Sequence, residues 1–442
     1  MSQQSATMKR TGKKPGMWNF GRKGWTVAIY QVVWFFFMTG MTVDGLNIIV
    51  PQIAEYRGWN ADTVLSISSP ASIIALFLVV VFGGIARKAG LKKTMVITMY
   101  AAGVVTILYG NAPTIPLYAV CLVLMVTLIN AFALVLGLSI CTNWFPTKKG
   151  VVMGFTTVGM NLASALISQI LNQLSSRSNI AVAISIMGGA IIVVGVLTQI
   201  FIKATPEEAG CYPDNDPAVA AVLAKVREER GAESTVTYAD ALKNPKTWIF
   251  GVAYGFFGMA TVGIMSQLVG FFQETKGYSM QAALNVITAA AIIGIIGSVV
   301  WGVVDQKIGT KKTSVIFGIW YCIGILLLLS GSTAIMVIGI VMLGAGIGGN
   351  GNFCPSMAAL IYGRKDFPIC YSVLNTIVGV VRSLSFIVLA GLRVISSGYT
   401  LPYVVFAIVA LAGGLMIIGV KVVPVVDMDA AQEDETCGAA KL

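Results

Sequence analysis

The chain has 442 residues, of which 56% are hydrophobic and 11% are charged, and its net charge is +11 at pH 7. Soluble domains carry about 25% charged residues, so this composition excludes an ordinary soluble protein and indicates a membrane protein. The chain contains no histidine and no G-x-x-x-x-G-K-[ST] phosphate loop, which excludes imidazole chemistry and argues against ATP as the energy source. The seven cysteines show no paired spacing, so we expect no disulfide and no metal site. Because no nucleophile–base constellation is visible and histidine is absent, we also expect no enzymatic activity, and we expect no cofactor.

In chain order, twelve apolar runs are long enough to cross about 30 Å of hydrocarbon as helices. They lie near residues 25–51, 63–85, 94–111, 115–140, 151–173, 180–202, 247–272, 282–304, 313–332, 334–360, 371–394 and 401–423. The first run follows a polar, basic segment and is too long for a signal peptide, so we expect no cleaved leader. The runs predict an all-α membrane protein with twelve transmembrane helices.

The Lys and Arg residues are distributed unevenly between the connecting segments. If the N-terminus is cytoplasmic, the outer loops hold only Arg57, Arg177, Lys276 and Arg393. This asymmetry follows the positive-inside rule and predicts cytoplasmic termini in a plasma membrane, the inner membrane of a prokaryote. The positive net charge therefore reflects topology in a lipid bilayer, and we expect no nucleic-acid partner.

A shift of 219 residues aligns the first half of the chain with the second. The loop after the second run, Gly83-x6-Gly90-x-Lys92-Lys93, falls on the loop after the eighth run, Gly302-x6-Gly309-x-Lys311-Lys312. The repeat predicts a tail over 1–24, a six-helix bundle over 25–202, a cytoplasmic linker over 203–246, a second bundle over 247–423 and a tail over 424–442. Paired halves of this kind commonly build a transport site near the bilayer midplane.

Twelve runs in a six-plus-six repeat, with this loop in each half, resemble the major facilitator superfamily. The resemblance implies two pseudo-symmetric six-helix bundles and implies that the eight Gly and Lys residues of the two loops act in gating. The chain departs from the family signature at one position, which usually holds Asp. Arg87 occupies that position in the first half and Gln306 in the second, with Asp305 one place earlier.

A finer resemblance concerns the oxalate/formate antiporter and monocarboxylate transporter branch of the family. Asn143-Trp-Phe-Pro-Thr-Lys-Lys-Gly150 is similar to its connection between spans four and five, and Ala241-Leu-Lys-Asn-Pro-Lys-Thr-Trp248 to its entry into span seven. The branch often carries a basic residue in span eleven for a substrate carboxylate, and Arg382 occupies this span. The second basic residue that the branch often has in span eight is absent here.

Asp44 and Arg382 are the only charged residues deep inside apolar runs. A charge at the bilayer centre costs at least ~2.5–3.5 kcal/mol, so it commonly serves a function. Arg382 lies about 15 Å into its run, near the midplane, and its planar fork of donors suits a carboxylate. Asp44 lies about 28 Å along its run, in the outer half, where a carboxyl can carry a proton. The alternatives are structural: Arg382 ties helices together, and Asp44 caps a broken helix beside Gly45. These depths leave open whether the two side chains touch.

Neutral polar residues on the expected central spans are further candidates for substrate binding. The four that we select are Asn47, Asn130, Gln267 and Asn352. Hydrogen bonds between membrane helices are ordinary structural contacts worth ~0.6 kcal/mol on average, so a structural role is the alternative for each of them.

The sequence therefore predicts a secondary transporter that acts as a monomer and moves a small organic anion, most simply a monocarboxylate. Transport would proceed by alternating access and would be coupled to protons or to exchange. The alternatives within this class are a zwitterion carrier that uses Asp44 and Arg382 at opposite ends of its substrate, and a proton-driven multidrug exporter. From another class, a membrane sensor would bind its ligand without net transport and signal through residues 203–246.

Overall fold

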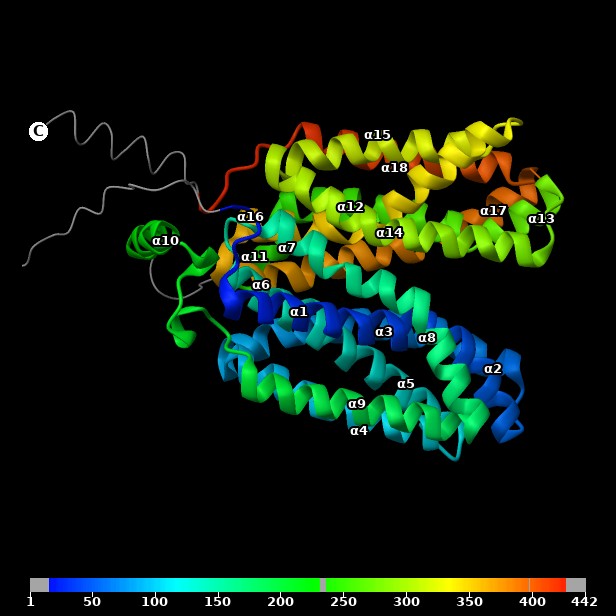
Figure 1. Ribbon diagram of the computed structural model, residues 1–442, viewed down its shortest axis with the longest axis horizontal. Coiled ribbons are helices and arrows are strands. Elements are labelled where there is room, and N and C mark those ends of the chain that lie inside the picture. The colour runs from blue at the N-terminus through cyan, green and yellow to red at the C-terminus, as the bar shows by residue number, and fades with distance from the viewer. Residues whose placement is uncertain (1–15, 231–235, 397, 427–442) are drawn as a thin grey trace, which may run out of the picture.

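The computed structural model describes residues 16–230, 236–396 and 398–426 (Figure 1). Residues 1–15 and 427–442, which make up most of the two predicted tails, lie outside the described residues. All regular structure in the described ranges is helical. This confirms the all-α fold that the apolar runs predict.

The first six spans precede the linker, and three of them are interrupted helices. The first span comprises α1, η1 and α2, the fourth α5, η2 and α6, and the fifth α7 and α8. The bounds are α1 (Gly21–Thr39), η1 (Gly40–Asp44), α2 (Leu46–Arg57), α3 (Ala61–Ala89), α4 (Leu91–Asn111), α5 (Ile115–Asn130), η2 (Ala131–Gly137), α6 (Leu138–Trp144), α7 (Lys149–Thr156), α8 (Val158–Arg177) and α9 (Ile180–Phe201).

The linker holds four short helical elements, and the remaining spans follow it. The bounds are η3 (Glu207–Ala209), η4 (Pro213–Asn215), α10 (Pro217–Arg230), α11 (Tyr238–Lys243), α12 (Pro245–Met265), α13 (Leu268–Lys276), α14 (Met280–Ile308), α15 (Thr310–Leu328), α16 (Thr333–Ser383), α17 (Ser385–Ser396) and α18 (Thr400–Ile418). Elements η1 and η2 are π-helical, and η3 and η4 are 3-10 turns.

Eleven helical stretches among the described residues are long and apolar enough to cross a membrane. The longest, Thr333–Ser396, has 64 residues and would extend ~96 Å as one helix, about three times the thickness of the hydrocarbon. Gly363 interrupts this helical stretch with a φ of 65° and a ψ of −172°, a backbone conformation that residues other than glycine avoid. This stretch therefore holds spans ten and eleven, and the twelve-span architecture follows.

Equivalent residues in the two halves begin and end equivalent helices. Asn60 and Ser279 cap the starts of α3 and α14, each accepting a hydrogen bond from the backbone N–H three residues on. Gly58 and Gly277 end α2 and α13 with φ values of 66° and 69°, the left-handed conformation that closes many helices. The pairs aligned by the sequence repeat therefore have the same local structure.

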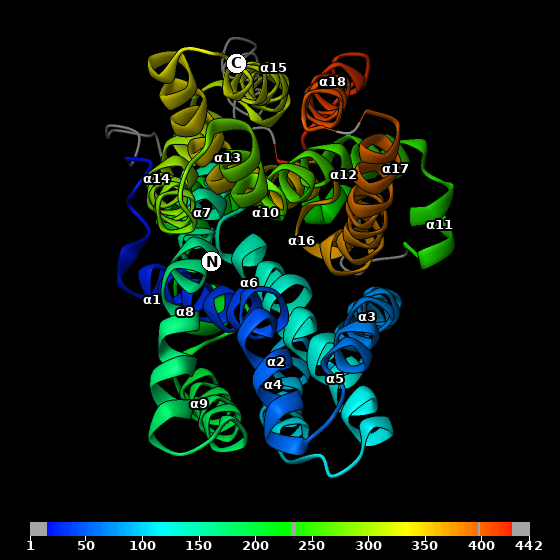
Figure 2. The same ribbon diagram turned by 90° about the vertical axis from the view of Figure 1, so that its right-hand side faces the viewer.

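Helices α1 to α9 form one bundle, and α12 to α18 form a second bundle beside it (Figures 1 and 2). We call these the first and the second bundle. Helix α4 packs on α9 in the first, and α12 and α14 pack on α16 in the second. Between the bundles, α7 and α8 contact α14, and α3 contacts α16. Helices α10 and α11 lie at one end of the molecule, the linker end, and the opposite end is the far end.

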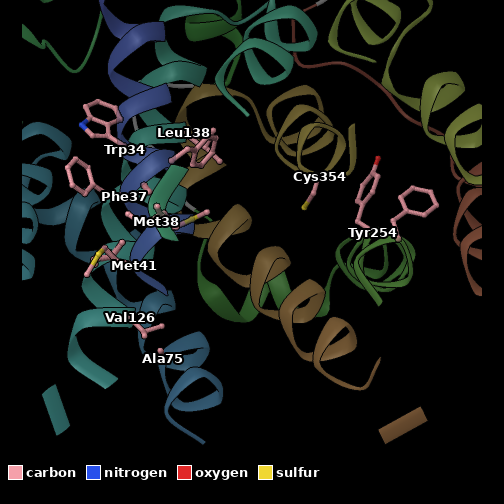
Figure 3. Packing of buried hydrophobic residues seen from close by; sticks show 14 of the residues in the cluster. Trp34, Phe37, Met38, Met41, Ala75, Val126, Leu138, Tyr254 and Cys354 are labelled. Atoms are coloured by element: carbon pink, nitrogen blue, oxygen red, sulfur yellow. The ribbon is translucent and has the colours of Figure 1, made fainter. Parts of the chain in front are cut away.

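Large apolar side chains fill the interior of both bundles. Trp34 and Met41 of the first span are fully buried, and Figure 3 shows them on the first bundle, with Tyr254 and Cys354 across from them on the second. By contrast, Ile296 and Ile387 are 64% and 70% exposed. Exposed apolar side chains of this size suit a surface that faces lipid tails, which are as apolar as leucine.

Glycines let the two bundles touch at the linker end. A Cβ on Gly154 of α7 would lie 2.5 Å from the Cα of Gly302 of α14, so no larger residue fits without a shift of backbone. A Cβ on Gly83 of α3 would lie 2.5 Å from the carbonyl oxygen of Pro368. Among the described residues, hydrogen bonds between the bundles occur at the linker end or as far as the middle of the spans. The linker end is therefore the closed end.

Candidate functional site

A π-helical segment places Asp44 in the first span. The backbone N–H of Gly45 donates to the carbonyl oxygen of Gly40 at 2.9 Å, which closes a turn with one extra residue. A Cβ on Gly45 would lie 2.0 Å from that oxygen, so this turn requires glycine. Single π turns within helices occur frequently at functional sites. Asp44 is the last residue of the segment and is half-buried.

Among the residues that the structure describes, the carboxylate of Asp44 has one hydrogen-bond partner, which comes from span five. The hydroxyl of Ser164 in α8 donates to Oδ2 of Asp44 at 2.5 Å. Ser164 itself is exposed. The acid is therefore held by a neutral donor on an exposed residue, and no cation within the described ranges forms an ion pair with it.

Arg382 lies in the last turn of α16, immediately before an interruption of span eleven at Leu384. The aliphatic part of the Arg382 side chain packs against α12 at Gly258. A Cβ added to Gly258 would lie 3.1 Å from Cδ of Arg382. The side chain is exposed. Within the described part of the chain, no hydrogen bond or ion pair engages its guanidinium. Because a guanidinium offers five donors, this group is available to an anion.

The two intramembrane charges belong to different bundles and do not pair. Asp44 is bonded to Ser164, and Arg382 rests against Gly258. The ion pairs resolved within residues 16–230, 236–396 and 398–426 join Arg364 to Glu207 and Arg393 to Glu274. In this conformation Asp44 and Arg382 therefore act as separate centres.

Asn352 lies at the interface between the bundles and is fully buried. Its Oδ1 accepts a hydrogen bond of 2.5 Å from the hydroxyl of Thr157, and its Nδ2 donates to the carbonyl oxygen of Ser298 at 2.8 Å. Thr157 is the residue at which span five is interrupted between α7 and α8. The amide is thus engaged on both sides, and the structure gives it a bridging position between helices.

The other three predicted substrate ligands have different surroundings. Asn130 is half-buried and donates to the carbonyl oxygen of Val126 in its own helix at 2.7 Å. Gln267 lies at the break between α12 and α13, where its Oε1 accepts a hydrogen bond of 3.0 Å from Arg393. Asn47 lies in the first turn of α2, exposed, three residues after Asp44. Of these amides, Asn47 is the one placed beside an intramembrane charge.

The predicted gating residues lie at the linker end in both bundles. Gly83 and Gly302 make the close contacts with the opposite bundle described above. Gly90 and Gly309 have φ values of 91° and 86° and directly precede α4 and α15. The four lysines of the two loops, Lys92, Lys93, Lys311 and Lys312, lie in the first turns of these helices.

The shifted acid of the second loop faces the start of α7 in the first bundle. Asp305 is 3% exposed and accepts a hydrogen bond of 2.6 Å from Ser356. A Cβ on Gly150 would lie 3.0 Å from its Cγ, and the side chain of Gln306 donates to the carbonyl oxygen of Thr147 at 2.9 Å. A carboxylate near a helix N-terminus is favourable. The one-residue shift therefore preserves a contact between the bundles.

The linker contributes a buried acid that the sequence analysis did not identify. Asp214 has a φ of 55° and is 1% exposed. Its carboxylate accepts hydrogen bonds from the backbone N–H groups of Thr147 and Lys148, at 2.9 and 3.2 Å, and from the Thr147 hydroxyl at 2.8 Å. Burial raises the pKa of Asp214, and these hydrogen bonds oppose the increase. The ammonium of Lys148 in turn bonds to the carbonyl oxygens of Asp214 and Asn19.

Family comparison identifies the type of protein to which this site belongs. A model of the Major Facilitator Superfamily matches residues 32–297 and 284–436. The uncharacterized MFS-type transporter YhjX of Escherichia coli (strain K12) is 21% identical over 297 residues, which cover 66% of this chain and 70% of that protein. The membrane sensor protein UhpC of the same organism is 24% identical over 299 residues, 63% of this chain and 64% of that protein.

Solved structures of the family share the fold. The human organic anion transporter MFSD10 (TETRAN) superposes with a TM-score of 0.65 at 10% identity, over 91% of this chain and all of that one. The transporter FucP, in its outward conformation, has a TM-score of 0.67 at 12% identity, over 88% of this chain and 97% of that one. The chain therefore belongs to the Major Facilitator Superfamily and is a multi-pass membrane transporter, not an enzyme.

Proposed function

We propose that this protein is a secondary active transporter of small organic anions and that its substrate is a monocarboxylate. The observation that carries the proposal is the guanidinium of Arg382, which belongs to an exposed residue inside a membrane span and has no hydrogen-bond or ion-pair partner among the described residues. An unpaired charge in a span is costly, and a substrate carboxylate would satisfy it with two parallel hydrogen bonds. A single cation suits a single carboxylate, whereas a dicarboxylate would require two.

Asp44 is the proposed proton-carrying group. It lies in the bundle opposite to Arg382, on a π turn, and its partner Ser164 is a neutral hydroxyl. A carboxyl without a cation partner can gain and lose a proton without breaking an ion pair. Because Asp44 and Arg382 are separate, a proton on Asp44 and an anion on Arg382 can be bound at the same time, as proton-coupled transport requires.

We further propose that the two bundles, residues 25–202 and 247–423, are the units that move in alternating access. The closed linker end, with Gly154 against Gly302 and Gly83 against Pro368, supports this division. The distribution of Lys and Arg favours a linker end and termini that face the cytoplasm, and we propose this orientation in the inner membrane of a prokaryote. The structure then corresponds to a carrier that is closed toward the cytoplasm, and we propose that a single chain suffices for transport.

The resemblance to the oxalate/formate antiporter and monocarboxylate transporter branch supports the same substrate class, because Arg382 occupies the span in which that branch often binds a carboxylate. Coupling to protons and exchange of one anion for another both fit this arrangement. Asp44 favours proton coupling, since a pure exchanger needs no intramembrane acid.

A second candidate function is ligand sensing without transport. The observation that favours it is the 24% identity to UhpC, whose name describes a membrane sensor. A sensor of this kind would pass its signal through the linker. In the linker, Asp214 bonds to Thr147 of the first bundle, and Glu207 pairs with Arg364 of the second. Sensing and transport predict the same binding site and differ in net flux.

The proposal is tested with purified protein in two steps. A thermal-shift screen against monocarboxylates, dicarboxylates, amino acids and sugars identifies a ligand, because binding to the folded state alone raises its apparent stability. The selected compound is then offered to proteoliposomes with an inward proton gradient. Gradient-driven accumulation of a monocarboxylate supports the proposal, and binding without uptake supports the sensor. Stabilisation by amino acids alone supports the zwitterion carrier instead, and stabilisation by sugars alone contradicts a carboxylate site.

A further inference from the structure

The first part of the linker contacts both bundles at the linker end. The ammonium of Lys23 in α1 donates to the carbonyl oxygen of Ala209 at 2.6 Å. Two residues earlier, Glu207 accepts hydrogen bonds from Nη1 and Nη2 of Arg364 at 2.8 and 2.9 Å. Glu207 follows the last span of the first bundle, whereas Arg364 belongs to the second. This short turn therefore fastens the two bundles together.

The geometry at Arg364 is that of a carboxylate-binding site. Two parallel N–H···O bonds, one to each carboxylate oxygen, form the bidentate arrangement by which arginine recognises carboxylates. The Arg364 side chain is 17% exposed, whereas that of Glu207 is 53% exposed. The Arg364 side chain is thus largely buried, and the Glu207 carboxylate reaches it from a surface segment.

The position of Arg364 in the chain explains why it is fixed. It directly follows Gly363, whose φ of 65° turns the chain between spans ten and eleven. The backbone N–H of Val425 also donates to the carbonyl oxygen of Leu360, which ties the segment after the last span to the end of span ten, close to this turn. The arginine therefore projects from a constrained turn.

Arg364 also lines a cavity that both bundles form. The first bundle and its connecting loop contribute Thr142, Pro146 and Lys149, and the second contributes residues of the turn at Gly363. Lys149 adds a second positive charge to this cavity, which Asp305 and Asp214 partly offset. While Glu207 is in place the cavity has room for about one water molecule, so an arriving carboxylate would occupy the space that Glu207 vacates.

We propose that Arg364 is a second carboxylate site, at the linker end, and that Glu207 is its tethered occupant while this end is closed. A small carboxylate arriving from the linker side would compete with Glu207 for the guanidinium and would release the linker from the second bundle. Arg364 then reports the anion concentration on the side into which the transporter would open. The inference does not depend on Arg382 as the transport site.

The site is tested by titration with sodium formate, read as the shift in melting temperature of purified protein. Every arm carries Arg382→Gln, so that the proposed transport site does not contribute, and sodium chloride at the same concentrations corrects for ionic strength. Glu207→Gln removes the tethered carboxylate and keeps its size. We expect it to lower the formate concentration of half-maximal shift about two- to fivefold, the factor that corresponds to a partly exposed ion pair.

The matched control is Glu208→Gln, an equal change of charge at the neighbouring exposed residue, which should leave the titration unchanged. Adding Arg364→Gln to Glu207→Gln should abolish the formate response, and Arg364→Lys should weaken it while preserving the charge. Gel filtration and the melting temperature without formate establish that each variant is folded.

The outcomes separate cleanly. A titration that Glu207→Gln does not change, or one that Glu208→Gln changes equally, overturns the proposal. A formate response that survives in the variant without Arg364 assigns the binding to another site and also overturns it. The proposed transport site is tested separately, with Arg382→Gln as a single variant. Substrate binding that this variant retains would contradict Arg382 as the transport site and would leave the result for Glu207 unaffected.

Discussion

The hydroxyl of Thr157 donates a hydrogen bond of 2.5 Å to the amide oxygen of Asn352 across the interface between the two bundles. Both side chains are buried, and Thr157 interrupts span five. Because the linker end must separate if the transporter opens there, this bond links the middle of the membrane to the closure of that end. Like the bonds from Gln306 to Thr147 and from Thr376 to Leu76, it directly joins the two bundles.

We expect Thr157→Val to destabilise the closed linker end. Valine keeps the shape of threonine but leaves Oδ1 of Asn352 buried without a donor, at a cost of about 1–3 kcal/mol. The purified variant should melt lower than the parent protein. Ser176→Ala, which removes an exposed hydroxyl on the same span, is the control and should melt as the parent does. Equal melting of the two variants would show that the bond contributes nothing to closure.

Gly154→Ala should destabilise the same closure by steric contact. A Cβ at this position would lie 2.5 Å from the Cα of Gly302, and forced overpacking typically costs about 1–3 kcal/mol. Gly189→Ala serves as the control, because nothing lies within 4 Å of the added Cβ in α9. There alanine should stabilise the helix by up to ~1 kcal/mol. A Gly154→Ala variant that melts as high as Gly189→Ala would contradict tight packing of the bundles.

The sequence predicted the spans and the two intramembrane charges, because twenty-residue apolar runs and charges within them depend only on local composition. It selected Asn352 for its expected place on a central span, but the partner of an amide depends on how the helices rotate and pack. Ser164 was not selected, since hydroxyl residues are common in spans. Its signal was weak: it lies three residues after Asn161 and seven after Thr157, on one polar face of span five.

The linker contacts could not be predicted for a different reason. Glu207 and Asp214 lie in a charged, proline-containing segment whose composition indicates only a polar connection. Their partners are distant in sequence: Arg364 belongs to the second bundle, and the backbone of Thr147 and Lys148 lies in the connection between α6 and α7. Such contacts arise from tertiary structure, and no local pattern encodes them.

Arg382→Ala should abolish substrate uptake in proteoliposomes, although the protein still reaches the membrane. Arg382→Lys should lower the apparent affinity about tenfold, since lysine offers a point charge without the fork and a hydrogen bond to a charged group is worth about 1.5–3 kcal/mol. Arg177→Ala, at the exposed C-terminal end of α8, is the matched control and should transport normally. Normal uptake by Arg382→Ala would place the anion site elsewhere and would remove the basis for the carboxylate-transporter assignment.

Asp44→Asn should preserve substrate binding and remove the dependence of uptake on a pH gradient. Asparagine resembles the protonated acid and cannot release a proton, and it retains an oxygen that can accept the hydrogen bond from Ser164. The measurement compares uptake with and without an inward proton gradient. Asp62→Asn, at an exposed position in the first turn of α3, should behave as the parent protein. Accumulation that still follows the gradient in Asp44→Asn would reduce Asp44 to a structural role.

The last prediction concerns the independence of the two charges. Removing one member of a buried ion pair is costlier than removing both, because the remaining charge is left unpaired. Asp44 is bonded to Ser164 and Arg382 packs on Gly258, so the structure predicts no such coupling. The stability changes of Asp44→Asn and Arg382→Gln should therefore add in the double variant to within ~0.5 kcal/mol.

Melting of the four purified proteins, the parent, both single variants and the double variant, measures this additivity. A double variant that melts higher than Arg382→Gln alone would show that the charges stabilise each other, through water or in another conformation of the carrier. Asp44 would then hold Arg382 in the empty state, and the arriving carboxylate would displace it. Proton and anion would in that case compete for a single centre, whereas additivity assigns the anion to the second bundle and the proton to the first.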